Sequence, residues 1–271
     1  MNFQYIYGPV ESWRMGKSLG IDPISHRDKV CNLDCVYCQL GKAHGLTEER
    51  KAYVPTNIII HEISQFFEWV GFENPLMIEN IDYLTFSGRG EPTLAKNLGD
   101  MILSIRQIRE EKIAVITNST LLHLPEVRND LSLSDLVVAK LDAYDERSFS
   151  LVDKPMTGSS FKKVIEGLKT FRRQYHGRLA IQVMFIKENV ASAPKLASLI
   201  RDIGADEVQL NTPLRFCSVL PLNFNELSQI KEYFLDLPAV TVYERERKPI
   251  MPFSSKTTKL RHGCVRKLPF C

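Results

Sequence analysis

Nowhere does this sequence carry an apolar run of the roughly 18 residues that a membrane-spanning helix needs. Its first residues also lack the basic stretch and apolar segment of a secretory leader. The formal net charge of +3 is too small to indicate a polyanionic partner by itself. We therefore expect a cytoplasmic protein without a membrane span, whose six cysteines are reduced thiols or metal ligands rather than disulfides.

Apolar, β-rich runs alternate with helical patterns along the chain. Near-continuous apolar runs are typical of strands that are covered on both faces of a parallel sheet. The expected strands are residues 19–23, 83–87, 113–118, 136–141, 179–186 and 207–211, and the expected helices are residues 57–70, 98–110, 160–175, 193–203 and 226–235. Gly204 is expected to end the fourth helix and Asn225 to cap the last. Six β-α units predict an α/β fold, as a barrel or an open sheet, with ligands at the carboxyl ends of its strands.

Three cysteines lie within eight residues, directly after the first expected strand. Cys31, Cys35 and Cys38 can converge from one loop on a single soft metal centre. Three thiolates suit a cubane iron–sulfur cluster that keeps one iron free of protein ligands. The alternatives are a zinc site, completed by a histidine such as His26 or His44 or by a distant cysteine, and three unrelated buried thiols.

Small and polar residues follow the next strands. Gly88 and Gly90 would let the backbone approach a ligand, and Glu91 could bind an ammonium, although a tight turn before Pro92 explains the same residues. Asn118 and Ser119 could bind a ribose or a carboxylate, or simply cap a helix.

Charged and amide side chains mark the later strand ends. Lys140 and Asp142 share a strand face and could both point into the cavity, Lys140 toward a carboxylate or phosphate and Asp142 toward a sugar hydroxyl, or they could form a surface ion pair. The backbone around Leu210 could cradle adenine, with Asn211 near substrate polar groups. Arg215 is the candidate for an anionic substrate group, with a structural salt bridge as the alternative.

The spacing Cys31-x3-Cys35-x-Tyr37-Cys38 resembles the signature of the radical S-adenosylmethionine (SAM) superfamily. This resemblance implies a partial (β/α)6 TIM-like barrel of parallel strands within a single domain of residues 1–271, with a core of about residues 18–215, a short N-terminal extension and a C-terminal extension of about residues 216–271. It implies that the three cysteines hold a [4Fe–4S] cluster, that SAM binds its fourth iron, and that SAM cleavage gives a 5′-deoxyadenosyl radical which abstracts hydrogen from a substrate. A flavodoxin- or ferredoxin-type protein would donate the electron.

The same resemblance assigns cofactor-binding roles. The segment after the second strand is similar to the Gly-Gly-Glu segment that holds the amino group of SAM, although Arg89 separates its glycines. The implied cofactor-binding residues are Tyr37, Ser87, Gly88, Gly90, Glu91, Pro92, Asn118, Ser119, Lys140, Asp142, Leu210 and Asn211. Cys217 could donate a hydrogen atom to a substrate radical, or join Cys264, Cys271 and His262 in an auxiliary cluster, or be a small buried hydrophobe.

Residues 12–23, 87–93 and 210–215 are similar to a subgroup related to the wyosine-type tRNA-modifying enzymes, which implies tRNA or a nucleobase as substrate. This chain departs from the tricyclic-base-forming members because it has no cysteine before Cys31. Two other functions stay open: modification of a protein or peptide side chain by the same chemistry, and a non-catalytic zinc or iron–sulfur binding module.

Overall fold

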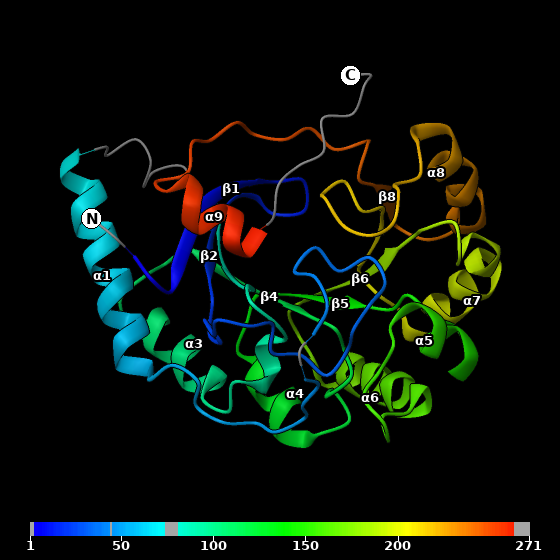
Figure 1. The fold of residues 1–271 in the computed structure, drawn as a ribbon, viewed down its shortest axis with the longest axis horizontal. Coiled ribbons are helices and arrows are strands. Elements are labelled where there is room, and N and C mark those ends of the chain that lie inside the picture. Colours follow the sequence, from blue (N-terminus) through cyan, green and yellow to red (C-terminus); the bar gives the residue numbers. More distant parts are fainter. Residues whose placement is uncertain (1–2, 44, 74–80, 263–271) are drawn as a thin grey trace.

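The computed structural model describes residues 3–43, 45–73 and 81–262, and one sheet of eight strands forms the centre of this part of the chain. The strands are β1 (Ile6–Ser12), β2 (Gly16–Ile21), β3 (Tyr83–Phe86), β4 (Lys112–Thr117), β5 (Leu136–Lys140), β6 (Arg178–Met184), β7 (Glu207–Asn211) and β8 (Ala239–Thr241). β1 pairs antiparallel with β2, and all other neighbours pair parallel in chain order. The sheet curls into a half-barrel (Figure 1).

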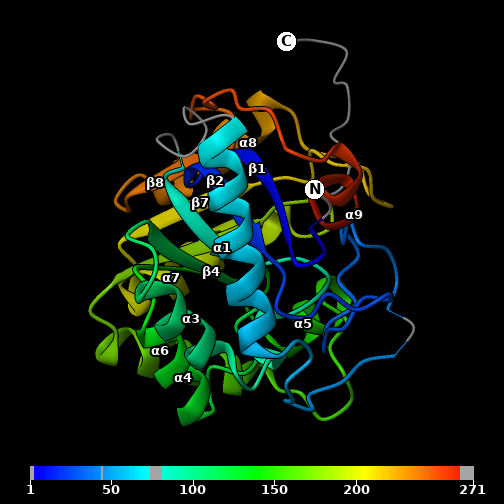
Figure 2. The same ribbon diagram turned by 90° about the vertical axis from the view of Figure 1, so that its left-hand side faces the viewer.

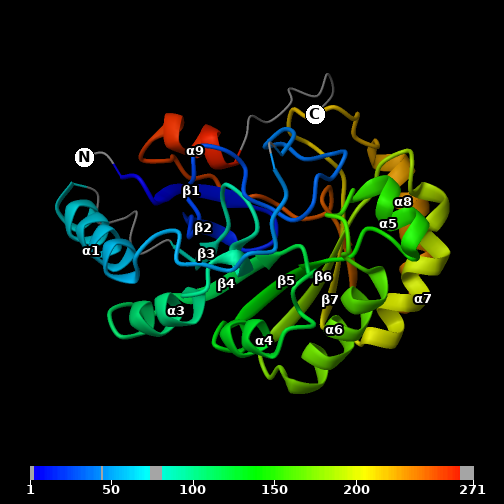
Figure 3. The same ribbon diagram turned by 60° about the horizontal axis from the view of Figure 1, so that its bottom comes forward.

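Helices cover the outer face of the half-barrel, and loops cross its inner face (Figure 3). The helices are α1 (Thr56–Glu73), α3 (Leu98–Arg106), α4 (Pro125–Ser132), α5 (Glu146–Val152), α6 (Phe161–Gln174), α7 (Ala193–Ile203), α8 (Phe224–Lys231) and α9 (Ser255–His262). α1 runs along the outside beside β1 and α3 (Figure 2). α9 returns to β1, where Gly8 N donates to Thr258 Oγ1 at 3.1 Å.

The predicted α/β half-barrel is confirmed, and its six expected parallel strands are β2 to β7. Their apolar residues are almost all buried, as expected for strands covered on both faces. The sequence did not indicate β1 or β8. Gly8 and Pro9 interrupt the apolar pattern of β1, and β8 has only three residues.

Of the two helix caps predicted from the sequence, one is correct and the other is wrong. Gly204 ends α7 in the left-handed conformation, at φ 76°, as predicted. Asn225 is not the cap of α8. The helix begins two residues earlier, because Asn223 Oδ1 accepts from Glu226 N at 2.9 Å and Glu226 returns the bond to Asn223 N. No helix in the described ranges is both long and apolar enough to cross a membrane.

Candidate active site

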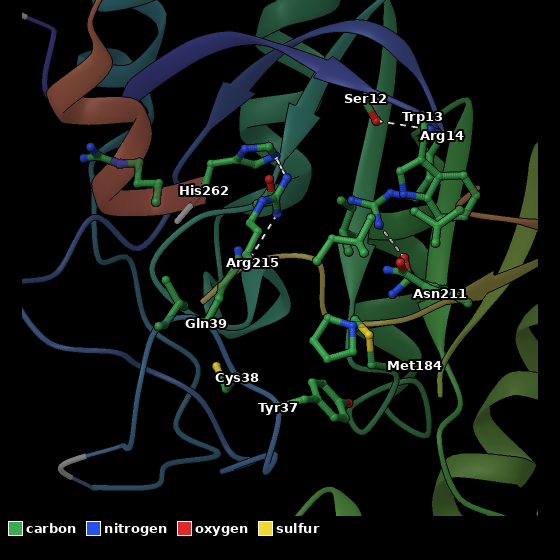
Figure 4. Close-up of a pocket in the computed structure, with 18 of the residues that line it drawn as sticks. Ser12, Trp13, Arg14, Tyr37, Cys38, Gln39, Met184, Asn211, Arg215 and His262 are labelled. Atoms are coloured by element: carbon green, nitrogen blue, oxygen red, sulfur yellow. Dashed lines mark hydrogen bonds between the residues drawn. The ribbon is translucent and has the colours of Figure 1, made fainter. Parts of the chain in front are cut away.

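A cavity of about 250 Å³ lies at the carboxyl ends of the parallel strands (Figure 4). Residues from the ends of five strands line it, together with the cysteine loop and α9. Of the predicted site residues, those that line this cavity are Tyr37, Cys38, Ser87, Gly88, Gly90, Lys140, Asn211 and Arg215. The parallel sheet thus brings together residues that lie up to 178 positions apart in the chain.

The cysteine loop is anchored to the segment after β3. Val30 N donates to Arg89 O, and Glu91 N donates to Val30 O, both at 3.0 Å, so the two segments pair like parallel strands. A Cβ at Gly90 would lie 1.7 Å from Val30 O. Gly90 therefore makes room for the cysteine loop, and a Cβ at Gly88, which has φ 150°, would lie 2.4 Å from the Asp22 carboxyl carbon. Both glycines also line the cavity, and their expected approach to a ligand stays a prediction.

Groups that favour negative charge surround the thiols. Leu33 N and Asn118 Nδ2 donate to Cys31 Sγ, at 3.4 and 3.6 Å. Although burial opposes its charge, the ammonium of buried Lys29 has a raised pKa because the three cysteine sulfurs and Asp34 lie near it. Neither Lys29 nor this role of Asn118 was predicted.

The three thiols suit a metal cluster, because the positive charge of bound iron stabilises their ionised form. Burial raises the pKa of Cys31 to about 11 and that of Cys35 well above its usual range, so both are neutral without metal. Metal coordination deprotonates a thiol, and the N–H donors and Lys29 then stabilise the thiolates. Within the described ranges, no three His, Cys, Asp or Glu side chains form a cage for a single ion. Three thiols with such neighbours match the donor set of an iron–sulfur cluster.

Beside Cys35 lies a buried hydrogen-bonded group of Tyr37, Lys140, Asp142 and Asp153. Lys140 Nζ lies 2.6 Å from Tyr37 Oη and 3.1 Å from Asp142 Oδ2. Tyr37 Oη donates to Asp142 Oδ2 and contacts Asp153 Oδ1 at 3.2 Å. Asp153 was not predicted, because it follows α5 without any motif.

This group holds no net charge. Burial raises the pKa of Asp153 to about 8, and the nearby Asp142 carboxylate adds to the effect. Burial also keeps the pKa of Tyr37 well above its usual range, with Asp142 acting in the same direction. Asp153 and Tyr37 are therefore neutral near pH 7, and the ammonium of Lys140 balances Asp142.

Asp142 departs from the expectation that it shares the cavity with Lys140. Its carboxylate is buried, accepts from Met184 N and faces the Lys140 and Tyr37 side chains, outside the main cavity. Their ion pair is real, but it is internal rather than on the surface. Only Lys140 lines the cavity.

Glu91 binds the end of β4 rather than pointing into the cavity. Its Oε1 accepts from Thr93 N at 3.1 Å and from the hydroxyls of Thr93 and Thr117 at 2.7 Å, and its Oε2 accepts from Asn118 N at 2.7 Å. Glu91 thereby positions Asn118, whose amide reaches Cys31. A role of Glu91 with an ammonium stays a prediction.

The other predicted residues lie either outside the main cavity or outside the described part of the chain. Ser119 is buried at φ 71°, and its hydroxyl donates to Lys140 O at 2.8 Å; Pro92 starts a buried 3-10 turn. The side chain of Leu210 is fully buried in the core, and a role of the backbone around it in binding adenine stays a prediction. Cys217 packs against Tyr37 and Ile186, outside the main cavity. Cys264 and Cys271, the other members of the expected auxiliary cluster, lie outside the described residues.

Arginines line the cavity, and one of them, Arg215, is hydrogen-bonded to Gln39 of the cysteine loop. Figure 4 shows Arg215 beside His262 and Gln39, with Arg14 across the cavity and Cys38 and Tyr37 at the lower end. Arg215 Nη1 donates to Gln39 Oε1 at 3.0 Å, and Arg14 Nη1 donates to Gln182 Oε1 at 2.6 Å. Arg14 and Arg247, which also lines the cavity, were missed. Their signal in the sequence was weak, because Arg14 is a single charge in a turn and Arg247 lies in a run of charges of alternating sign, residues 244–248.

Fold and site together define an α/β half-barrel enzyme with a three-thiol cofactor centre at the carboxyl end of its sheet. The family model of the radical SAM superfamily matches residues 29–200, and the chain belongs to that superfamily. It is therefore an iron–sulfur enzyme that uses SAM, as its signature implied.

Comparisons with individual proteins place the chain further. It is 38% identical over 214 residues to a UPF0026 protein of Synechocystis sp., which covers 79% of this chain and 77% of that protein. Its fold resembles SuiB of Streptococcus suis bound to SAM, with a TM-score of 0.59 and 16% identity over 79% of this chain and 48% of that one. It also resembles archaeal TYW1, with a TM-score of 0.56 and 14% identity over 86% of this chain and 82% of that one. At these identities the structural likeness establishes the fold alone.

Proposed function

We propose that this radical SAM enzyme cleaves SAM reductively and directs the resulting 5′-deoxyadenosyl radical to a hydrogen atom of a substrate bound in the cavity. The observation that carries the proposal is the position of the cysteine loop beside the cavity. Pairing of Val30 with Gly90 sets the three thiols beside a cavity that Cys38 and five strand ends line. When bound, a [4Fe–4S] cluster supplies the electron for cleavage of SAM.

The residues around the thiols have distinct roles in this proposal. Cys31, Cys35 and Cys38 hold the cluster, while Lys29 and Asn118 stabilise their negative charge. In this proposal SAM is bound by Ser87, Gly88, Gly90, Asn211, Tyr37 and Lys140, and the support is that they line the same cavity as Cys38. The other cofactor-binding candidates act through their neighbours: Glu91 holds Asn118, Ser119 holds the end of β5, and Asp142 holds Lys140, while the role of Pro92 stays a prediction.

The substrate class and the electron donor belong to the proposal as well. The resemblance of residues 12–23 and 210–215 to the wyosine-related subgroup supports tRNA or a nucleobase as substrate, and a flavodoxin or ferredoxin as the one-electron donor. We further propose that the enzyme acts in the cytoplasm, where such donors occur.

Anaerobic reconstitution with iron and sulfide tests the core of the proposal. The reconstituted wild-type protein should be brown, and it should release 5′-deoxyadenosine once dithionite and SAM are added. Cys35→Ala should lose both the colour and the product, because two thiolates cannot hold the cubane. Val36→Ala alters the same loop at a side chain that is no ligand, and should keep both. Release of 5′-deoxyadenosine by Cys35→Ala at the wild-type rate would refute the cluster assignment.

A further inference from the structure

Three guanidinium groups line the cavity without a carboxylate partner in the part of the chain that the structure describes. They belong to Arg14, Arg215 and Arg247. The other two cations of the cavity are balanced, since Arg261 Nε pairs with Asp22 Oδ2 at 2.8 Å and Lys140 Nζ pairs with Asp142 Oδ2 at 3.1 Å. Two cations of the cavity therefore have a buried carboxylate partner, whereas these three arginines have none among the described residues.

Neutral groups hold two of the three arginines in place. Glutamine carbonyls accept from Arg14 and Arg215, and His262 contacts the second amino group of Arg215. Arg14 Nε is buried and has no hydrogen-bond acceptor among the described residues. These contacts hold the two guanidinium groups in place, but they do not balance their positive charge and they leave Arg14 Nε without an acceptor. A buried charge or donor in this state costs free energy unless a ligand completes it.

The arginines also act on one another. Burial first, and then the positive charges of Arg14 and Arg247, lower the pKa of Arg215 to about 9. The pKa of His262 lies well below its usual value because of burial and the same arginines, so the ring adds no charge near pH 7. Glu11 also lines the cavity, but its side chain is exposed and accepts from Ile250 N.

The cofactor does not remove this excess of positive charge. SAM carries a sulfonium and an ammonium against one carboxylate, so it brings no net negative charge. An anionic group of the substrate would balance the three arginines. Three planar guanidinium groups that line one cavity suit an oxyanion with several acceptor oxygens, and arginine often binds phosphate for this reason.

We propose that Arg14, Arg215 and Arg247 form a subsite for a phosphoryl group of the substrate, an inference that rests on the radical SAM function proposed above. The phosphoryl group would hold the substrate against these three side chains, in the same cavity that Cys38 lines, and so keep its reacting carbon near the cofactor. A free ribonucleotide and a phosphate within an RNA strand share this chemistry, and the experiment separates them.

Trp13 provides a readout that does not need turnover, because the Arg14 guanidinium lies 5.6 Å from the centre of its ring. Inorganic pyrophosphate is titrated into the reconstituted protein at constant ionic strength, and the Trp13 fluorescence is followed in a Trp69→Phe background. We expect saturable binding, weakened at least about tenfold by Arg14→Gln and by Arg247→Gln. Arg173→Gln, an exposed arginine on α6, should leave binding unchanged.

Equal pyrophosphate binding by wild-type protein and by Arg14→Gln and Arg247→Gln would overturn the subsite, as would a response that potassium chloride reproduces. Arg14→Lys keeps the positive charge but loses the planar guanidinium group, so this variant should bind pyrophosphate with intermediate strength. Adenosine monophosphate and a short RNA oligonucleotide then compete with pyrophosphate, and the stronger competitor names the source of the phosphate. Release of 5′-deoxyadenosine without substrate is measured on the same samples, so a failure of the SAM chemistry is distinguished from a failure of the anion subsite.

Discussion

Two groups of ionisable side chains contribute to one cavity and differ in how their charge is balanced. The group beside Cys35, formed by Tyr37, Lys140, Asp142 and Asp153, is buried and internally neutral, and its Tyr37 and Lys140 line the cavity. The arginines Arg14, Arg215 and Arg247 have no carboxylate among the described residues to balance them. A balanced group stabilises the folded chain by itself, whereas an unbalanced group is completed by a ligand. The comparison therefore separates residues that build the site from residues that select what enters it.

Asp142→Asn should cause the largest loss of stability, because it removes the only negative charge of the neutral group and leaves the Lys140 ammonium buried without a carboxylate. Breaking a buried ion pair by removing one partner costs about 3–5 kcal/mol. Urea denaturation measures the change in the free energy of unfolding.

Glu166→Gln is the matched control for Asp142→Asn. Glu166 pairs with Lys162 at 3.8 Å on the surface of α6, where both side chains are more than half exposed. We expect a change below about 0.5 kcal/mol. Similar losses in the two variants would mean that the group beside Cys35 is solvated like a surface pair, and the comparison would fail.

Asp153→Asn should change how stability depends on pH. The pKa of Asp153 is raised from 3.8 to about 8 in the folded protein, so between these values the folded state holds a proton that the unfolded state has lost. The free energy of unfolding of the metal-free wild-type protein should therefore fall as the pH rises from about 4 to 8, relative to Asp153→Asn. Above pH 8 the difference should be constant.

Asp145→Asn serves as the control for this pH dependence. Asp145 caps α5 and has a pKa lowered by hydrogen bonds from Ser148, so its contribution is lost only as the pH falls below about 4. Parallel curves for the wild type and Asp153→Asn between pH 4 and 8 would show that Asp153 is ionised when folded. The neutral balance of its group would then be wrong.

The fold could be predicted because its signals are local. The strands β3 to β6 are mostly apolar, β2 ends in the apolar Leu19 and Ile21, and β7 alternates apolar and polar residues. Parallel strands then place their carboxyl ends at one edge whatever the loops contain. The three-cysteine spacing identified the metal centre for the same reason. The edge strands β1 and β8 were missed because one contains Gly8 and Pro9 and the other is short.

The sequence predicted several residues that line the cavity, such as Lys140, Asn211 and Arg215, but not the contacts between distant segments. It did not indicate that Thr93, Thr117 and Asn118 donate to the oxygens of Glu91. Gly90 was marked as a close approach, and the structure shows that Val30 O is the approaching group. Arg14 reaches the cavity from the turn between β1 and β2, which form one edge of the sheet, and its place there had no signal in the sequence.

Arg215→Gln should have the smallest effect on stability and the clearest effect on function. The variant gives up hydrogen bonds to Gln39 and His262 but relieves the repulsion by Arg14 and Arg247, which together with burial holds the pKa of Arg215 near 9. We expect the free energy of unfolding to stay within about 1 kcal/mol of the wild-type value. SAM cleavage without substrate should persist, while turnover of the substrate is lost. A loss of stability as large as that of Asp142→Asn would make Arg215 a structural residue. The arginines would then stabilise the fold, as the group beside Cys35 does, and the contrast between the two groups would fail.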